Sequence, residues 1–502
     1  MSQELFPYQT AAAYAILHQF SQGYKFVILD APPGTGKTYI GRFVMEELSS
    51  HDQHSLYSCH SKALQRQFNE DFPEVPVMYG RSNYPTELEP GMTAADCLGP
   101  ECSLCNVCPY RVAKEKFLHS PVGMTNISYF LSEANYVGVI NTDMIVLDEV
   151  DTLEKVLMDF AELSISEKNL RLRYGMYAPK KKTVESSWVD WAEAAYAKML
   201  LVRGKVIRKM KIDPNPQSVK EAQYVNGLVG KLKLLNDEEF GIRSGNWVYD
   251  GYNDGMIKFR PIKIANLANN LIWAHVDKVL LMSGTIISAQ SIANDLGIDN
   301  YEEVTLPSRF PAANRPIYIN PIAKMTAKST ILDYDRIVDQ IRVIMNNNAG
   351  RILIHTVSYR FALEIMNRLK SDRLITYTNN TAVESAISTY LDTPGSVLVA
   401  PSMSRGVSFS YDKCDVIIIV KIPYLSLGDK QVSARLYTPG GQLWYTVSAI
   451  RELIQMTGRG MRAADDRCAT YILDASFLDM FNRHGNKRLF PNWWRDAMII
   501  VN

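Results

Sequence analysis

Short apolar runs recur along the chain, and each is bounded by polar or turn-forming residues. In eight of them the apolar residues are continuous rather than alternating, which is typical of strands buried on both faces of a parallel sheet. The predicted strands are 25–30, 54–59, 144–148, 278–283, 351–356, 396–401, 415–420 and 470–474. Amphipathic segments separate these runs, so the pattern predicts an α/β protein.

The predicted strands fall into two groups. The proline-rich segment Ser308 to Pro321 lies between them and is predicted to be a linker. A chain of 502 residues is longer than one core normally supports, and roughly three or four domains are the prior expectation. We therefore expect two α/β domains that carry additional segments.

A different pattern occupies residues from about 152 to 260. Apolar residues recur at helical intervals from Trp188 to Met210, which predicts a long helix within a helical insertion. From Ser166 to Leu235 there are 15 Lys and Arg residues but six Asp and Glu residues, whereas the whole chain has a formal net charge of +1. This local excess fits either a solvated helical surface or a surface that contacts phosphates.

The segment APPGTGKT, Ala31 to Thr38, follows the first predicted strand and precedes an amphipathic segment. Its glycines permit the tight turn that directs backbone amides at phosphates, the lysine supplies a cation to the β- and γ-phosphates, and the last threonine can bind Mg²⁺. The strict pattern opens with glycine where this chain has Ala31. The residues predicted to bind nucleotide here are Gly34, Thr35, Gly36, Lys37 and Thr38.

Two further motifs complete a predicted ATP site. In DEVD, Asp148 at a strand end can hold Mg²⁺ through water, and Glu149 can orient and deprotonate the attacking water. In QMTGRGMR, which opens with Gln455, Arg459 and Arg462 are predicted at a glycine-containing helix start. Their spacing can direct two guanidinium groups toward one phosphate across an interdomain cleft, so both arginines and Gln455 are predicted catalytic residues.

Four of the seven cysteines, Cys97, Cys102, Cys105 and Cys108, lie in one short segment between the first two ATP motifs. In a reducing compartment such a cluster favours a metal over disulfides. Four thiolates suit tetrahedral Zn²⁺ as well as an iron–sulfur cluster, and an unmetallated set of core thiols is the third alternative.

The sequence does not open with a basic and then apolar leader, and no apolar stretch is long enough to cross a bilayer. We therefore expect a cytosolic or nuclear protein that has no membrane partner.

Together with SGT at 283–285, these motifs resemble those of superfamily 2 helicases, and the cysteine cluster narrows the resemblance to the iron–sulfur XPD/DinG family. The pattern looks closer to DinG-like proteins of bacteria and phages, which implies the cytoplasm of a bacterial or phage-infected cell. Similar segments run through nearly the whole chain: FPYQ at 6–9, HSKALQRQF at 60–68, GRSNYP at 80–85, CPYRVAK at 108–114, TNISYFL at 125–131, LMSGTI at 281–286, FPAANRPIY at 310–318 and DDRCATYILDASF at 465–477.

The resemblance implies two tandem RecA-like P-loop domains, with a cysteine-ligated cluster insertion and a mostly helical Arch insertion in the first. It also implies ATP, Mg²⁺ and a [4Fe-4S] cluster on the four cysteines, with Zn²⁺ as the alternative. The implied boundaries are 1–85, 121–151 and 261–310 for the first domain, 86–120 for the cluster, 152–260 for the Arch and 311–502 for the second domain.

Carried over by position, the resemblance places Gln9 beside the nucleotide. It places a further set of residues near DNA: Lys62 and Asn126 on the first domain, and Ser358, Ser402 and Arg405 on the second.

Two positions depart from the family pattern. Thr86 stands where a cysteine is common, so Cys97 would have to be the first cluster ligand. Arg405 and Ser408 stand where acidic residues are usual, which puts the usual coupling between DNA binding and hydrolysis in question.

The function expected from these features is that of an ATP-dependent DNA helicase that translocates 5′ to 3′, the direction being implied by the resemblance alone. A translocase that displaces proteins without robust unwinding, and an uncoupled DNA-binding scaffold, are the alternatives. The expected partners are single-stranded and forked DNA, together with replication or repair proteins, and the protein is expected to be a monomer.

A small loop-rich lobe with little apolar core needs its metal to fold. We therefore predict that Cys105→Ser unfolds the cluster segment and abolishes strand separation, while nucleotide binding stays largely intact. Unwinding and nucleotide-binding assays on the variant check this, and full strand separation would refute it.

Overall fold

The computed structural model describes most of the chain. The described residues are 5–49, 54–60, 62–86, 91–97, 107–137, 140, 142–213, 215–251, 255–377, 382–401, 413–461 and 465–501.

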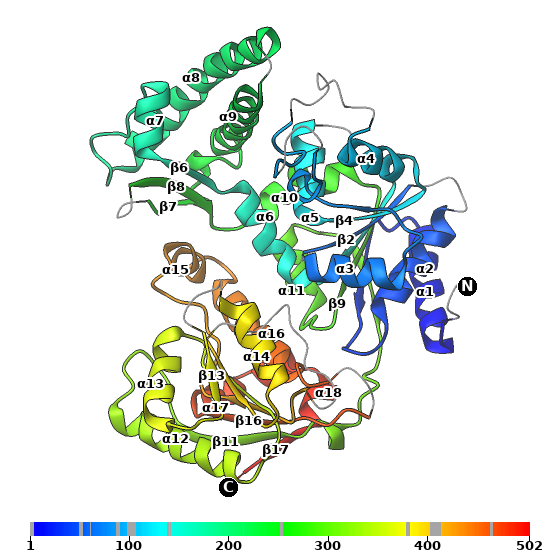
Figure 1. Cartoon of the computed structure of the whole chain (residues 1–502), viewed down its shortest axis with the longest axis vertical. Coiled ribbons are helices and arrows are strands. Elements are labelled where there is room, and N and C mark those ends of the chain that lie inside the picture. The colour runs from blue at the N-terminus through cyan, green and yellow to red at the C-terminus, as the bar shows by residue number, and fades with distance from the viewer. Residues whose placement is uncertain are drawn as a thin grey trace.

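The first lobe is built on a seven-stranded parallel sheet with the order β10-β1-β9-β5-β2-β4-β3 (Figure 1). Its central strands are buried along nearly their whole length because helices cover both faces. The strands are β1 (Phe26–Asp30), β2 (Ser55–Cys59), β3 (Val77–Met78), β4 (Val122–Asn126), β5 (Met144–Asp148), β9 (Lys278–Ser283) and β10 (Tyr301–Thr305).

Two groups of helices form the two cores of this lobe. The helices packed on one face of the sheet are α1 (Pro7–Ser21), α2 (Lys37–Ser49) and α3 (Lys62–Asp71). Those on the other face are α4 (Pro109–His119), α5 (Ile127–Ser132), α10 (Ala265–Leu271) and α11 (Ala289–Leu296).

The second lobe contains another seven-stranded parallel sheet, with the order β13-β14-β12-β15-β16-β11-β17. Its strands are β11 (Ile317–Ala323), β12 (Ile352–His355), β13 (Leu374–Thr376), β14 (Val397–Ala400), β15 (Val416–Ile419), β16 (Ala469–Asp474) and β17 (Met498–Ile500). One face packs on α12 (Ile331–Asn346) and α13 (Tyr359–Leu369). The other face packs mainly on α14 (Val383–Asp392), α16 (Gly441–Thr457), α17 (Ser476–Asn482) and α18 (Asn492–Arg495).

All eight predicted strands are present, and they divide between the two sheets as the sequence predicts, which confirms the two-domain α/β expectation. The predicted linker at 308–321 was wrong in its second half. Ile317 to Pro321 belong to β11, which pairs in parallel with β16 and β17. The prediction failed because a strand can accept a proline at an irregular position. Pro321 falls where the register between β11 and β16 shifts, so it does not interrupt a regular ladder of hydrogen bonds.

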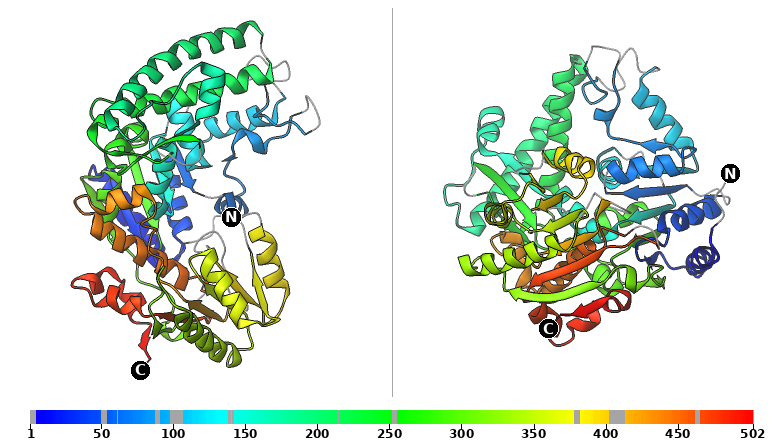
Figure 2. Two further views of the ribbon diagram at one scale, coloured as in Figure 1. Left: turned by 90° about the vertical axis from the view of Figure 1, so that its left-hand side faces the viewer. Right: turned by 60° about the horizontal axis from the view of Figure 1, so that its bottom comes forward.

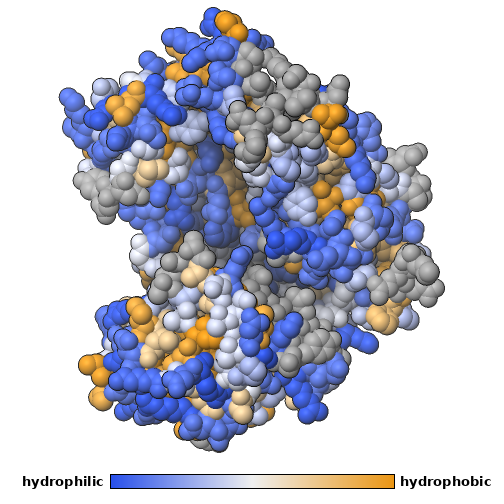
Figure 3. All heavy atoms as spheres, in the orientation of Figure 1, coloured by the Kyte–Doolittle hydropathy of each residue, from blue (hydrophilic) through white to orange (hydrophobic). Residues whose placement is uncertain are grey.

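An insertion after β5 rises from the first lobe (Figure 1; Figure 2). It contains α6 (Leu153–Ala161), α7 (Glu167–Tyr174), α8 (Glu185–Ile212) and α9 (Pro216–Leu235), together with the strands β6 (Leu163–Ser166), β7 (Trp247–Tyr249) and β8 (Met256–Pro261). The long helix predicted from Trp188 to Met210 corresponds to α8. The small antiparallel sheet β6-β8-β7 was not predicted. Figure 3 shows this face of the molecule hollowed where the insertion and the two lobes meet.

Aromatic packing holds the long helix α8 on the small sheet. The rings of Trp188 and Phe259 lie edge to face with centroids 5.3 Å apart, and Trp188 also packs on Tyr249 at 4.2 Å. Trp188 and Phe259 are almost completely buried, so this cluster forms the base of the insertion.

Helix α15 (Lys430–Leu436) joins the second lobe to the first through a buried arginine. The Arg435 guanidinium pairs with the carboxylates of Glu154 on α6 and Asp295 on α11, the latter at 2.7 Å, and it lies over the Trp444 ring. Burial, and then the neighbouring Glu154 carboxylate, raise the pKa of Asp295 to about 7. The buried guanidinium of Arg435 therefore forms ion pairs with two carboxylates of the opposite lobe.

The same helix also contacts the insertion. At its N-terminus Asp429 accepts a hydrogen bond from Arg260 of β8 at 2.9 Å. Gln431 donates to the Pro261 carbonyl at 3.3 Å, and Lys430 donates to the Tyr249 carbonyl at 3.3 Å. Helix α15 thus touches both lobes and the base of the insertion.

Among the helices that the structure describes, none is both long and apolar enough to span a bilayer.

We predict that Arg435→Met destabilises the protein by about 3 kcal/mol, because it leaves two mostly buried carboxylates without their cation. Denaturant unfolding measures the change. In the matched control Lys155→Met, which breaks the exposed Lys155–Asp159 pair, the free energy of unfolding should shift by less than about 0.5 kcal/mol. Equal effects of the two substitutions would contradict the structural role of Arg435.

Candidate functional site

The loop between β1 and α2 has the conformation that a phosphate-binding loop requires. Gly34 and Gly36 adopt φ angles of +78° and +73°, in the left-handed region that favours glycine. Lys37 and Thr38 follow in the first turn of α2, whose 13 residues give the helix N-terminus a positive potential. The loop therefore has the backbone features that are typical of a phosphate-binding loop.

Close contacts leave no room for side chains at the two glycines. A Cβ atom on Gly34 would lie 2.1 Å from the ring of Phe310, a residue of the segment that connects the lobes. A Cβ atom on Gly36 would lie 2.2 Å from Nε2 of Gln9.

Gln9 is buried and holds the loop from the side of α1. Its Nε2 donates to the Thr35 carbonyl at 3.0 Å, and its Oε1 accepts from the Phe6 backbone amide at 2.9 Å. Tyr8 donates to the same Thr35 carbonyl at 3.2 Å. Thr35 is itself buried, and its hydroxyl donates to the Pro32 carbonyl at 2.8 Å. The structure therefore brings Gln9 to the predicted nucleotide loop.

Lys37 faces the two acidic residues of the DEVD motif. Its Nζ lies 2.7 Å from Oε1 of Glu149 and 3.5 Å from Oδ1 of Asp148. Burial works to lower the pKa of Lys37, but the two carboxylates outweigh it and raise the pKa above its ordinary value. The lysine is therefore a permanent cation at the centre of the site.

Asp148 ends β5 and is 8 % exposed. One carboxylate oxygen accepts a hydrogen bond from the Tyr57 hydroxyl at 2.7 Å, and the other accepts from the Glu149 backbone amide at 2.9 Å. Burial raises the pKa of this carboxyl, while the Lys37 cation opposes the rise.

Glu149 adopts a left-handed backbone conformation, with φ of +54°. For a residue with a side chain this conformation costs on the order of 1–3 kcal/mol, and such strain is common at functional sites. The turn that it produces keeps the Glu149 carboxylate on the Lys37 side of the sheet.

The SGT motif at the end of β9 connects this site to the second lobe. The hydroxyls of Ser283 and Thr285 donate to the Asp151 carboxylate at 2.8 and 3.2 Å. From α16 of the second lobe, Gln455 donates to the Thr285 hydroxyl at 2.7 Å. Asp151 was missed by sequence reasoning, although its position as the last residue of DEVD was the available signal.

Arg459 lies beyond the C-terminal end of α16, which finishes at Thr457. The prediction that the arginines stand at a helix start was therefore wrong. Gly458 is the C-cap of this helix, so the glycine signal marked an end. The pKa of His355, a residue of β12, is lowered to about 3. Burial is the main cause, and the positive charge of the nearby Arg459 is the second. Arg462 lies outside the described residues.

The residues predicted near DNA make local contacts in the structure. Lys62 donates to the Asn83 side chain at 3.0 Å, Asn126 caps α5 by accepting from the Tyr129 amide at 2.8 Å, and Ser358 caps α13. Lys62 and Asn126 line one large cavity. Ser402 and Arg405 lie outside the described residues.

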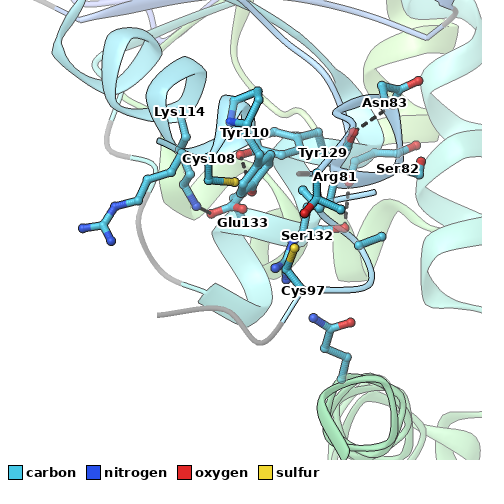
Figure 4. A pocket seen from close by; sticks show the side chains of 18 of the residues that line it. Arg81, Ser82, Asn83, Cys97, Cys108, Tyr110, Lys114, Tyr129, Ser132 and Glu133 are labelled. Atoms are coloured by element: carbon cyan, nitrogen blue, oxygen red, sulfur yellow. Dashed lines mark hydrogen bonds and ion pairs between the residues drawn. The ribbon is translucent and has the colours of Figure 1, made fainter. Parts of the chain in front are cut away.

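This cavity has a volume of about 1050 Å³ and lies between α4, α5, α9 and the segment around residues 80–97 (Figure 4). Cys97 and Cys108 both contribute to its wall, and the Cys97 thiol donates to the Thr93 carbonyl at 3.8 Å. Cys102 and Cys105 lie outside the described residues. Within the described part of the chain, no three His, Cys, Asp or Glu side chains gather as a metal site.

Charged and aromatic side chains both line the cavity wall (Figure 4). Lys114 pairs with the buried Glu133 at 2.7 Å, and the Arg81 guanidinium lies 5.4 Å from the centroid of the Tyr110 ring. The hydroxyls of Tyr110 and Tyr129 are 3.3 Å apart. The wall therefore offers both cations and aromatic rings to a ligand.

Comparisons with known proteins agree with this geometry. The helicase C-terminal domain family matches residues 341–497, and the family of the res subunit of type III restriction enzymes matches residues 2–155. Among curated proteins, none matches the sequence significantly.

Solved structures match over nearly the entire chain. A structure named XPD_Helicase is 17 % identical with a TM-score of 0.65, and the match covers 99 % of this chain and 100 % of that one. Xpd4 of S. tokodaii is 13 % identical with a TM-score of 0.61 at the same coverage of both chains. A third structure, XPD_APO, is 17 % identical with a TM-score of 0.60 and covers 98 % of this chain and 100 % of that one.

The chain thus has the fold of the XPD structures, and part of its second lobe matches the helicase C-terminal domain family. The comparisons agree with the resemblance that the sequence motifs indicate, and the family matches support a helicase-type ATPase, for which ATP and Mg²⁺ are expected. The iron–sulfur and DinG-specific parts of the resemblance stay predictions.

We predict that Gly36→Ala weakens nucleotide binding at least about tenfold, because the added methyl group displaces Gln9 from the loop and strains the backbone. Equilibrium titration with a fluorescent ATP analogue measures the change. Gly245→Ala is the matched control, since Gly245 has a φ of +72° but open space around its Cβ position. If both variants bind nucleotide like the wild type, the assignment of this loop is wrong.

Proposed function

We propose that the protein is an ATP-dependent DNA helicase that translocates 5′ to 3′ on single-stranded DNA and separates duplex. The observation that carries the proposal is the hydrogen bond from Gln455 of the second lobe to Thr285 of the first. Thr285 and Ser283 both donate hydrogen bonds to the Asp151 carboxylate. In the sequence, Asp151 comes two residues after the Asp148–Glu149 pair that faces Lys37. Hydrogen bonds therefore connect the second lobe to Asp151, whose carboxylate is close enough to the candidate ATP site to help raise the pKa of Lys37.

In the proposed mechanism, Lys37 and the loop amides bind the phosphates, while Thr38 and Asp148 hold Mg²⁺. The metal, when bound, neutralises charge that develops on the phosphate oxygens. Glu149 orients the attacking water and removes its proton. Because Glu149 is paired with Lys37 in the structure, the lysine has to exchange this carboxylate for phosphate before the base is available. Arg459 and Arg462 are proposed to contact the γ-phosphate from the second lobe.

We assign the DNA path to the cavity that contains Lys62 and Asn126. Aromatic rings stack on bases at about 1–3 kcal/mol per base, and cations track the phosphate backbone. The Tyr110 ring with Arg81 above it provides both kinds of contact. Ser358, Ser402 and Arg405 are proposed to contact the same strand on the second lobe.

We further propose that Cys97, Cys102, Cys105 and Cys108 hold a [4Fe-4S] cluster, with Zn²⁺ as the alternative. Two of these cysteines lie at the wall of the cavity, so a cluster there would stiffen the loops beside the proposed DNA path. The residues 86–120 and 152–260 are assigned as the cluster and Arch insertions of the first domain.

The proposed activity is tested with forked duplexes that carry either a 5′ or a 3′ tail, after anaerobic purification with iron and sulfide analysis. The expected result is ATP-dependent unwinding of the 5′-tailed substrate. A roadblock protein bound to the strand separates a translocase from a helicase. Unwinding of only the 3′-tailed substrate would overturn the direction, and absence of DNA-stimulated ATP turnover would overturn the function.

We predict that Glu149→Gln lowers ATP turnover by about 10²–10⁴-fold, because the amide cannot accept the proton from water. Nucleotide affinity should change by no more than a few-fold, since Lys37 and the loop remain. Steady-state ATPase assays with single-stranded DNA measure turnover. Glu74→Gln, a change at an exposed carboxylate that pairs with Arg42, is the control. Wild-type turnover by Glu149→Gln would remove this residue from the mechanism.

A further inference from the structure

A fully buried tyrosine stands beside the acidic end of β5. Tyr57 lies on β2, is 1 % exposed, and is paired in register with Val146 of β5, two residues before Asp148. Its ring packs on Phe68 of α3 with centroids 4.6 Å apart. The Tyr57 hydroxyl is a polar group in largely apolar surroundings. A buried hydroxyl that lacks a hydrogen-bond partner is costly, so its partner needs to be identified.

The hydroxyl of Tyr57 contacts the acidic side of the ATP site. It donates a hydrogen bond to Oδ2 of Asp148 at 2.7 Å. Burial and the Asp148 carboxylate raise the pKa of Tyr57 well above its ordinary value, so the phenol keeps its proton and acts as the donor. Its hydrogen-bond partner, Asp148, is one of the two residues that the proposed function assigns to Mg²⁺.

The hydrogen bonds also fix how the Asp148 carboxylate is turned. With Oδ2 held by Tyr57, Oδ1 receives the Glu149 amide at 2.9 Å and faces Lys37 at 3.5 Å. Without the phenol, Oδ2 would remain as a buried acceptor with one donor fewer, and the carboxylate could rotate.

We propose that Tyr57 is a positioning residue for Mg²⁺, which orients the carboxylate of Asp148 through its hydrogen bond. The inference rests on the proposed function of this site. A partner that hydrogen-bonds to a ligating carboxylate typically contributes about 10–100-fold to metal affinity, and Tyr57 has that relationship to Asp148.

The test is the Mg²⁺ dependence of nucleotide binding by Tyr57→Phe, a substitution that removes only the hydroxyl. Binding of a fluorescent ADP analogue is titrated with and without Mg²⁺, and Mg²⁺ is titrated at fixed nucleotide. We expect the apparent Mg²⁺ affinity to fall about tenfold, while nucleotide affinity in the absence of Mg²⁺ stays within about twofold of the wild type.

Two comparisons make the result specific. Tyr334→Phe removes a hydroxyl from another nearly buried tyrosine, in the second lobe, whose oxygen has no hydrogen-bond partner among the described residues, and it should leave the Mg²⁺ dependence unchanged. In a double-mutant cycle with Asp148→Asn, Tyr57→Phe should have no additional effect, because the phenol acts through the carboxylate.

The possible failures are distinguishable. If wild-type binding is independent of Mg²⁺, the proposed function of the site is wrong. If the wild type responds to Mg²⁺ and Tyr57→Phe responds equally, the inference is wrong although the site stands. If Tyr57→Phe loses nucleotide affinity equally with and without Mg²⁺, the residue is merely structural and the inference is also overturned.

Discussion

The order of four neighbouring strands determines what the first lobe can do. The neighbouring strands β1, β9, β5 and β2 of the sheet are all parallel, so their carboxyl ends meet at one edge. That edge brings together the loop that leads to Lys37, the Ser283–Thr285 turn and the Asp148–Glu149 pair. Tyr57, near the end of β2, reaches the same edge. These groups are contributed by four different strands or by the segments that follow them.

The buried charges at this edge are mutually dependent. Lys37 would be costly in such a place without carboxylates, and Asp148 would be costly without the lysine and its hydrogen bonds. The second lobe joins this set through Gln455 and Thr285. Arg435 makes a comparable arrangement at some distance along the chain, where a buried cation of one lobe neutralises two carboxylates of the other. These two contacts between the lobes are thus polar and directional.

The sequence predicted the parts of this arrangement that depend on local pattern. Continuous apolar runs identified eight strands, and glycine, lysine and threonine in fixed order identified the phosphate loop. Strand order is different, because it depends on which long-range pairings form; nothing local places β9 between β1 and β5. The strand β4, which reads VGMTN, and the strand β11, which contains Pro321, lack a continuous apolar run and were not predicted.

The hydrogen bonds and ion pairs between side chains that are far apart in the sequence could not be predicted from the sequence pattern either. Tyr57 looks like one more apolar residue of its strand until the fold places Asp148 beside it. The glycine before Arg459 is compatible with either end of a helix, and only the observed end of α16 decides between them. Arg435 sits in an ordinary amphipathic stretch, and its two acidic partners lie 140 and 281 residues away in sequence.

The contact between Phe310 and Gly34 has a consequence for how this chain can change. The ring occupies the space that any side chain at position 34 would need, so the loop and the interlobe segment are sterically complementary. A larger side chain at position 34 would require Phe310, 276 residues further along the chain, to move or to be replaced by a smaller residue. Replacement of Phe310 alone would not suffice, because the φ of +78° at Gly34 disfavours every residue that carries a side chain.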